Sequence, residues 1–193
     1  VPIFRKEGER EAVMAKVREV VAAAPSVRFH VDDRENLTPG AKYYEWEQKG
    51  VSFRIEIGPK DLAKGQVALA KRVLNEGEER KQFLPEAEVI STLAARLEAF
   101  QAFLLERARA RREANSHRGV TDLERLAEIV DGPGGFVYAG WCGGGGCEER
   151  VKEETKATIR VIPDEEFRSA ERPERCIVCG TEAVEEVIWA RAY

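Results

Sequence analysis

The fold of the first half of this sequence is decided by the stretch Gly50-Val51-Ser52-Phe53-Arg54-Ile55-Glu56-Ile57-Gly58-Pro59-Lys60-Asp61. Valine, phenylalanine and isoleucine alternate there with polar residues, a period of two that is typical of a strand with one buried face. Arg54 and Glu56 therefore share the polar face. Glycine followed by proline predicts a turn after this strand. Gln66–Val73 is then expected to be the second strand of a hairpin.

Upstream of this hairpin, the sequence predicts a β-α-β unit. Val1–Phe4 is a short apolar run, Glu7–Ala24 carries valines at helical spacing, and Val27–Val31 again alternates apolar with polar residues. Two strands joined by a helix favour a parallel pair with a right-handed crossover. A second helix is expected from Thr38, a preferred N-cap residue followed by proline, to Lys49.

Downstream of the hairpin, residues 75–82 are typical of a solvated loop. A long amphipathic helix follows, with apolar residues at steps of three and four: Ile90, Leu93, Leu97, Phe100 and Leu104. Beyond it we expect a short helix over residues 123–130 and strands over residues 136–141, 157–162 and 184–189.

Together these elements predict an α/β fold, with a mixed sheet flanked by helices in residues 1–116 and a small α+β domain in residues 117–193. The boundary is placed at Asn115–Gly119, where composition and charge change. Residues 1–116 hold 21 basic and 19 acidic residues, residues 117–193 hold 10 and 16, and the chain of 193 residues has a net charge of −4. This balance argues against a general polyanion binder but leaves room for a local basic patch.

The sequence contains no apolar run near the ~20 residues that a membrane-spanning helix needs. It also shows no secretory signal. A cytoplasmic protein without a membrane partner is therefore expected. Because Val1 starts within an expected strand and is not methionine, we expect this chain to be part of a longer protein.

All four cysteines lie in the second half, as Cys142-x4-Cys147 and Cys176-x2-Cys179. Two close pairs, each in a glycine-containing turn, suit a tetrahedral zinc ion that takes two thiolates from each loop. Four sulfurs leave no open position, so one structural zinc per chain is expected. A disulfide framework, typical of small secreted domains, and a redox Cys-x-x-Cys are the alternatives.

A second group of residues has the chemistry to recognise a base. Helical spacing puts Tyr43 and Glu47 on one face, Arg54 lies on the polar face of the next strand, and Lys60 lies in the turn after it. The N7 and O6 atoms of guanine accept hydrogen bonds from Arg or Lys. Its exposed N1–H and amino group donate to a carboxylate, and unpaired RNA bases stack on aromatic rings. An ordinary surface Glu–Arg pair is the alternative interpretation.

Three stretches of the first half resemble the anticodon-binding domain of class II aminoacyl-tRNA synthetases. They are Asp32-Asp33-Arg34, Thr38-Pro39-Gly40-Ala41-Lys42-Tyr43-Tyr44-Glu45-Trp46-Glu47 and the stretch from Gly50 to Asp61 quoted above. The pattern Gly-Val-x-x-Arg-x-Glu-x-Gly-Pro-Lys-Asp occurs across several of these enzymes. Together with the four cysteines and the final Tyr193, it resembles the prolyl-tRNA synthetase family of the archaeal/eukaryotic type, from Val1 to Tyr193.

The resemblance implies that Glu47, Arg54 and Lys60 contact guanines of the anticodon loop of proline tRNA, with Tyr43 as a stacking partner. Proline codons begin with CC, so two anticodon bases are guanine. It also implies a parent proline–tRNA ligase, a homodimer that uses ATP and magnesium in a catalytic domain absent from this chain. The chain alone is expected to be a monomer and holds no residue of a catalytic site. The arginines after residue 106 complement a helix C-terminus or contact tRNA phosphate.

Two rival functions remain open on the sequence. The first is a free-standing zinc-containing RNA-binding module with no enzyme attached. The second is the anticodon-binding region of another class II synthetase, of threonyl, glycyl or histidyl type.

Overall fold

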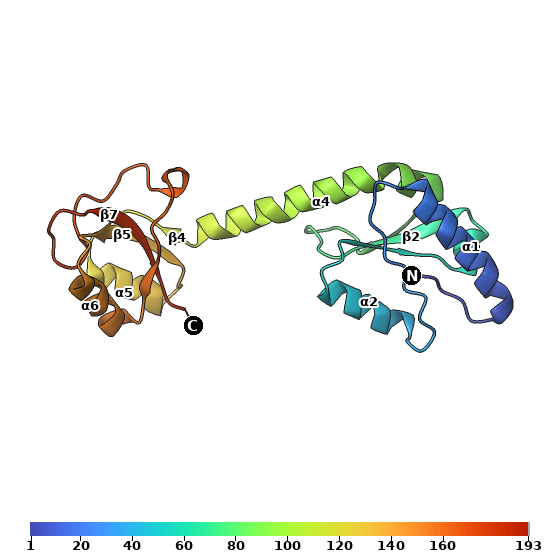
Figure 1. Ribbon diagram of the computed structural model, residues 1–193, viewed down its shortest axis with the longest axis horizontal. Coiled ribbons are helices and arrows are strands. Elements are labelled where there is room, and N and C mark those ends of the chain that lie inside the picture. The colour runs from blue at the N-terminus through green and yellow to red at the C-terminus, as the bar shows by residue number, and fades with distance from the viewer. Residues whose placement is uncertain (193) are drawn as a thin grey trace. The chain divides into compact units, whose positions relative to one another are not determined.

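The computed structural model describes residues 1–192. The final Tyr193, on which the family resemblance partly depends, lies outside the described residues. The chain divides into two compact units, Val1–Leu105 and Glu106–Tyr193, and Figure 1 shows their helices and strands. The division falls within a helix, and the domain bounds 1–116 and 117–193 stay a prediction.

The first unit contains helices and an antiparallel sheet of three strands in the order β1-β2-β3. Its elements are α1 (Glu7–Ala23), α2 (Pro39–Gln48), β1 (Phe53–Glu56), the one-turn α3 (Pro59–Leu62), β2 (Gln66–Lys71), β3 (Lys81–Pro85) and the first part of α4 (Glu86–Ala114). The predicted helices α1, α2 and α4 and the predicted hairpin of β1 and β2 are confirmed.

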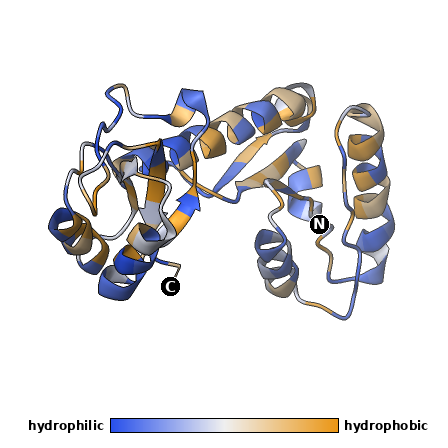
Figure 2. Ribbon diagram, turned by 60° about the vertical axis from the view of Figure 1, so that its left-hand side comes forward, coloured by the Kyte–Doolittle hydropathy of each residue, from blue (hydrophilic) through white to orange (hydrophobic). Residues whose placement is uncertain are grey.

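The core of this unit lies between the apolar face of the sheet and two helices. Val13 of α1 and Val89 of α4 are fully buried against Val67 and Leu69 of β2. In Figure 2 the helices carry orange and blue bands along their length, as expected for helices with one buried face. Burial of this apolar face fixes the hairpin beneath α1 and α4.

The predicted parallel pair between Val1–Phe4 and Val27–Val31 is wrong. The first residues pair with the chain at Ile57 instead, through a parallel bridge from Pro2 and backbone hydrogen bonds of Val1 and Ile3. Val27–Val31 forms no strand. The alternation of apolar residues was informative about burial only, because Phe29 packs against the core without a hydrogen-bonded neighbour strand. Side-chain burial and strand pairing are separate requirements, and this segment meets the first alone.

The second unit contains a mixed sheet of four strands in the order β4-β5-β7-β6, with β4 parallel to β5 and the other pairs antiparallel. Its elements after α4 are β4 (Ser116–His117), α5 (Leu123–Asp131), β5 (Phe136–Trp141), α6 (Gly145–Thr155), β6 (Thr158–Val161), the 3-10 turn η1 (Glu165–Phe167) and β7 (Glu185–Ala190). The predicted α+β character is confirmed, including α5, β5, β6 and β7.

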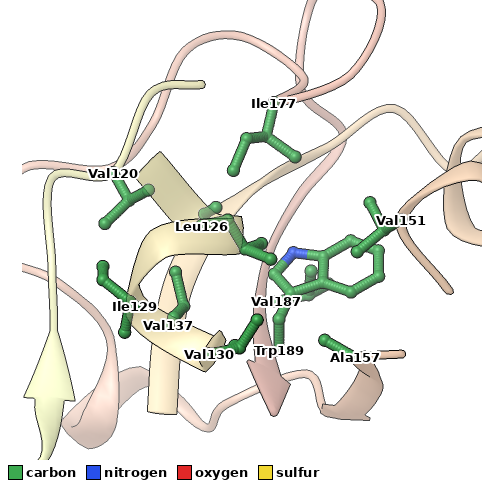
Figure 3. Packing of buried hydrophobic residues seen from close by; sticks show 11 residues of the cluster. Val120, Leu126, Ile129, Val130, Val137, Val151, Ala157, Ile177, Val187 and Trp189 are labelled. Carbon is green, nitrogen blue, oxygen red and sulfur yellow. The ribbon is translucent and has the colours of Figure 1, made fainter. Parts of the chain in front are cut away.

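Trp189 is the centre of the second core. Its indole ring is fully buried, and Figure 3 shows it between Leu126 of α5 and Val151 of α6, with Val187 of the same strand below. Helices α5 and α6 thus cover the sheet face that carries Val187 and Trp189. Among residues 1–192, no helix has the length and apolar character required to cross a bilayer.

Candidate functional sites

The polar face of β1 carries a cluster of charged residues with Arg54 at its centre. The Arg54 Nη1 donates to Glu47 Oε1 of α2 at 2.9 Å, and its Nε donates to Glu56 Oε1 at 3.0 Å. The guanidinium carbon lies 3.7 Å from the ring centroid of Tyr43, also on α2. Because Tyr43 and Glu47 are four residues apart, one helical face presents both to Arg54. The structure therefore brings together three of the four residues predicted to bind a base.

Glu56 is the most buried residue of this cluster. Its side chain is 3 % exposed, and Lys81 Nζ of β3 donates to its Oε2 at 2.5 Å. Burial on its own would raise the pKa of Glu56, but hydrogen bonds from Lys81, Tyr43 and Arg54 outweigh that effect and hold its pKa below the usual value. Burial and the neighbouring Glu56 carboxylate also raise the pKa of Tyr43, so its hydroxyl stays protonated. Glu56 is thus an anion throughout the neutral range.

Arg80 and Lys81 belong to this cluster but were not predicted from the sequence. The Arg80 Nη1 lies 3.3 Å from both carboxylate oxygens of Glu47, and its side chain is 53 % exposed. Both residues fell in the segment expected to be a loop. Lys81 instead begins β3, which pairs with β2, and Arg80 directly precedes that strand, where its carbonyl accepts from the Lys71 N–H at 3.0 Å. Glu56 could have been found, because the period of two already put it on the face of Arg54.

Lys60, the fourth residue predicted to bind a base, makes no contact of this kind with the cluster. It is exposed on α3, and within residues 1–192 no hydrogen bond or ion pair joins it to Tyr43, Glu47 or Arg54. Its role in binding stays a prediction.

A second polar network holds α2 in place. Asp32 is 2 % exposed and accepts hydrogen bonds from Arg34 at 2.7 and 2.8 Å and from the Trp46 indole at 2.8 Å. The buried Lys42 donates to the Asp32 carbonyl at 3.2 Å. The Arg34 contacts, followed by that of Trp46, hold the pKa of Asp32 far below its usual range despite its burial. This network fixes the helix that presents Tyr43 and Glu47.

The four cysteine sulfurs of the second unit converge, and all lie within 4.8 Å of one another. Cys142 Sγ lies 3.6 Å from Cys147 Sγ and 3.7 Å from Cys179 Sγ. A disulfide bond has its sulfurs about 2.05 Å apart, and all four cysteines are free. In contrast, a tetrahedral ion with metal–sulfur bonds of about 2.3 Å has its sulfurs about 3.8 Å apart. The spacing fits the edges of a metal tetrahedron.

Backbone contacts bring the two cysteine pairs together. Cys142 directly follows β5 and Cys147 lies in the first turn of α6, so the expectation that both stand in a loop is wrong for Cys147. The other pair is held against β5, because the Ile177 N–H donates to the Gly140 carbonyl at 3.0 Å. The indole of Trp141 donates to Gly144 at 3.1 Å and fixes the segment between the first two cysteines.

The electrostatics of the four thiols favour a cation at their centre. Hydrogen bonds from Thr181 lower the pKa of Cys179 to about 6. Desolvation, followed by hydrogen bonds with the other cysteines, raises the pKa of Cys147 to about 12. Four thiolates at these distances would repel one another, whereas a divalent cation deprotonates and neutralises coordinating thiols. The donor set can therefore hold a metal ion.

Two protein-family models match this chain. Residues 1–96 match an anticodon binding domain, and residues 123–193 match the prolyl-tRNA synthetase C-terminal domain. The first unit is therefore an anticodon-binding domain of the aminoacyl-tRNA synthetase class.

The whole chain is similar to proline–tRNA ligases. It is 46% identical over 194 residues to the enzyme of Roseiflexus castenholzii and 45% identical to that of Chloroflexus aurantiacus. A crystal structure of prolyl-tRNA synthetase from Cryptosporidium parvum, complexed with L-proline and AMP, superposes with a TM-score of 0.76 at 32% identity and covers all of this chain. The chain belongs to the prolyl-tRNA synthetase family and comprises its anticodon-binding and C-terminal domains. This family assignment removes the threonyl, glycyl and histidyl alternatives.

The chain spans about two fifths of the length of these relatives, 39% of the two bacterial ligases and 40% of the Cryptosporidium parvum chain. Its matches are to their anticodon-binding and C-terminal parts.

Proposed function

We propose that the first unit of this chain recognises the anticodon loop of proline tRNA for a proline–tRNA ligase. The observation that carries the proposal is the cluster of Arg54, Glu47 and Tyr43, which combines a planar cation, a carboxylate and an aromatic ring on one surface. Arg54 would donate to N7 and O6 of a guanine. Glu47 would accept from its N1–H and amino group, and Tyr43 would support the base by stacking. Lys60 is proposed as a further contact to the anticodon.

A guanine would replace the contacts that these side chains make with each other. In the free unit Arg54 already donates to Glu47, and both groups are partly desolvated. A base that offers acceptors and donors together satisfies both residues at once. Guanine alone offers the acceptor pair N7 and O6 to the guanidinium fork together with the donor pair N1–H and amino group to the carboxylate, so the other bases pair these two side chains less completely. The cluster is therefore suited to guanine above the other three bases.

The proposal is tested by titrating the purified chain with RNA stem-loops that differ only in the anticodon. We expect tighter binding of the loop with two adjacent guanines. Arg54→Ala should weaken that binding by ~1–3 kcal/mol, about 5- to 150-fold, the size of one good bidentate base contact. Arg54→Lys keeps the charge but loses the planar fork, and it should also bind more weakly.

Arg18→Ala is the matched control, because Arg18 is an exposed arginine on α1 of the same unit. Its binding curve should coincide with that of the wild type. If the wild-type chain bound scrambled loops equally well, or if Arg54→Ala bound as the wild type does, anticodon recognition by this cluster would be rejected.

The metal held by the second unit is proposed to be one zinc ion with a structural role. Zinc binds four thiolates in a closed tetrahedron, in which no position remains for a substrate. Cys142, Cys147, Cys176 and Cys179 would be its ligands. Elemental analysis should find about one zinc per chain, and Cys176→Ser should lose it and unfold the second unit at lower urea concentration. A wild-type chain purified without zinc and unable to take it up would contradict this assignment.

Attachment of proline to tRNA with ATP and magnesium is proposed for the full-length protein, in the part of its relatives that this chain does not span. The homodimeric state implied by the family resemblance is likewise a proposal for the parent enzyme.

A further inference from the structure

The strand register of the first unit places an exposed aromatic ring on the same sheet face as Arg54. In antiparallel pairs, residues directly opposite each other point to the same face. Arg54, Ala70 and Lys81 form one such row across β1, β2 and β3. Glu56, Ala68 and Phe83 form the adjacent row. Phe83 therefore shares a face with the charged cluster, although it lies on a strand that the sequence did not predict.

This face is not the one that builds the core. The opposite face carries Val67, Leu69 and Leu84, which pack with α1 and α4 in the core of the unit. In Figure 1, α4 passes on one side of the strands and α2 lies on the other. The face with Phe83 is thus the side of α2, and α2 contributes Tyr43 and Glu47 near β1.

The side chain of Phe83 is exposed enough to contact a ligand. Its side chain is 58 % exposed, one of the most exposed large apolar residues in the described chain. Within residues 1–192 its ring neither stacks on another aromatic ring nor lies beneath a cation, whereas the Tyr43 ring has Arg54 at 3.7 Å and Lys81 at 5.8 Å. Two residues before it in the same strand lies the 37 % exposed Lys81, which is ion-paired with Glu56. An exposed aromatic ring is the surface on which single-stranded RNA bases stack.

We propose that Phe83 is a stacking platform for an unpaired base of the RNA loop, next to the base that Arg54 reads. The inference rests on the proposed function, because it takes the RNA loop as the ligand. Stacking accepts any base, since every base has a π-face. Phe83 therefore contributes affinity and holds the loop open, while Arg54 and Glu47 supply the discrimination between bases.

The test uses the stem-loop with the proline anticodon, carrying the fluorescent base 2-aminopurine at one loop position at a time. Stacking on an aromatic ring quenches this base, so wild-type protein should quench one position strongly. Phe83→Leu keeps an apolar side chain but lacks a π-face, and it should lose that quenching and bind roughly 5- to 100-fold more weakly. Phe83→Trp should keep both the quenching and the binding affinity. Phe167→Leu, which removes an exposed ring from the second unit, is the matched control and should leave both unchanged.

The outcomes separate this inference from the proposed function. Wild-type protein that prefers the proline anticodon while Phe83→Leu retains full quenching and affinity would overturn the platform and leave anticodon recognition standing. Quenching that requires Phe83 in every loop sequence, without preference for the proline anticodon, would support the platform and reject anticodon recognition. Loss of affinity in Phe167→Leu equal to that in Phe83→Leu would also overturn the inference.

Discussion

Gly140 is the position at which a single methyl group should disturb the cysteine site most. It lies in β5 and forms a parallel bridge with Cys176. A Cβ atom on Gly140 would lie 2.3 Å from the Arg175 carbonyl oxygen and 3.0 Å from the Ala183 Cβ. The closest ordinary carbon–oxygen contacts are about 3.3 Å, so Gly140→Ala must push the segment away by about 1 Å. Metal sites accept distances within about 0.2 Å of ideal, so the displaced Cys176 would no longer fit its tetrahedron.

The cost to stability can be estimated from two contributions. Overpacking a well-filled site costs ~1–3 kcal/mol. Stretching the hydrogen bond from Ile177 N–H to the Gly140 carbonyl, 3.0 Å in the structure, adds about 1 kcal/mol. Gly140→Ala should therefore lower the free energy of unfolding of the second unit by ~2–4 kcal/mol. Urea unfolding with and without a chelator measures this change, and a chromophoric chelator measures zinc affinity, which should fall as well.

Gly146→Ala is the matched control, because a Cβ there meets no atom within 4 Å and lies at the exposed start of α6. Alanine is the better helix former, so stability should be unchanged or rise by up to ~1 kcal/mol. Equal urea midpoints and equal zinc affinity for the two alanine variants would refute the close approach at Gly140.

Two further perturbations test the elements that present the Arg54 cluster. Asp32→Asn weakens the charge-assisted contacts with Arg34 and Trp46 and should cost ~1–3 kcal/mol at neutral pH. Because folding lowers the pKa of Asp32, its stabilisation is present above the unfolded pKa of about 3.9 and is lost as the pH falls towards the folded pKa; urea midpoints measured from neutral pH into acid should therefore converge for wild type and variant, and parallel curves would contradict this. Thr38→Ala removes the side-chain acceptor of the Ala41 N–H and should cost ~1 kcal/mol, whereas Thr38→Ser should be close to neutral in the same urea assay.

Elements with a strong local signal were predictable from the sequence. Thr38 caps α2 as expected, because its hydroxyl accepts from the Ala41 N–H within the first turn. Gly50 adopts the positive φ of 83° for which glycine suits a helix end. The alternation in β1 placed Arg54 and Glu56 on one face, and the structure confirms that face. In each case the deciding interaction lies within a few residues of the chain.

Elements whose stability comes from distant partners were not predictable. The strand β3 contains two polar residues and ends in proline, so only its pairing with β2 makes it a strand. Helix α6 begins inside a glycine run, so its sequence carries no clear start signal. It ends at Thr155, and the next residue, Lys156, has the positive φ of 63° that glycine usually adopts at a helix end. For the same reason Arg80 and Lys81 were missed, because their place beside Arg54 depends on strand register.

The mutual pairing within the Arg54 cluster also has a consequence for selectivity among polyanions. Three cations, Arg54, Arg80 and Lys81, are each tied to Glu47 or Glu56, so the free surface is close to charge-balanced. A chain of phosphates alone would have to compete with carboxylates already in place and would gain little by doing so. Glu47 and Glu56 therefore compete with any ligand that offers negative charge alone. Only a ligand with both hydrogen-bond donors and acceptors can replace their contacts, and this disfavours binding of other nucleic acids through their phosphates.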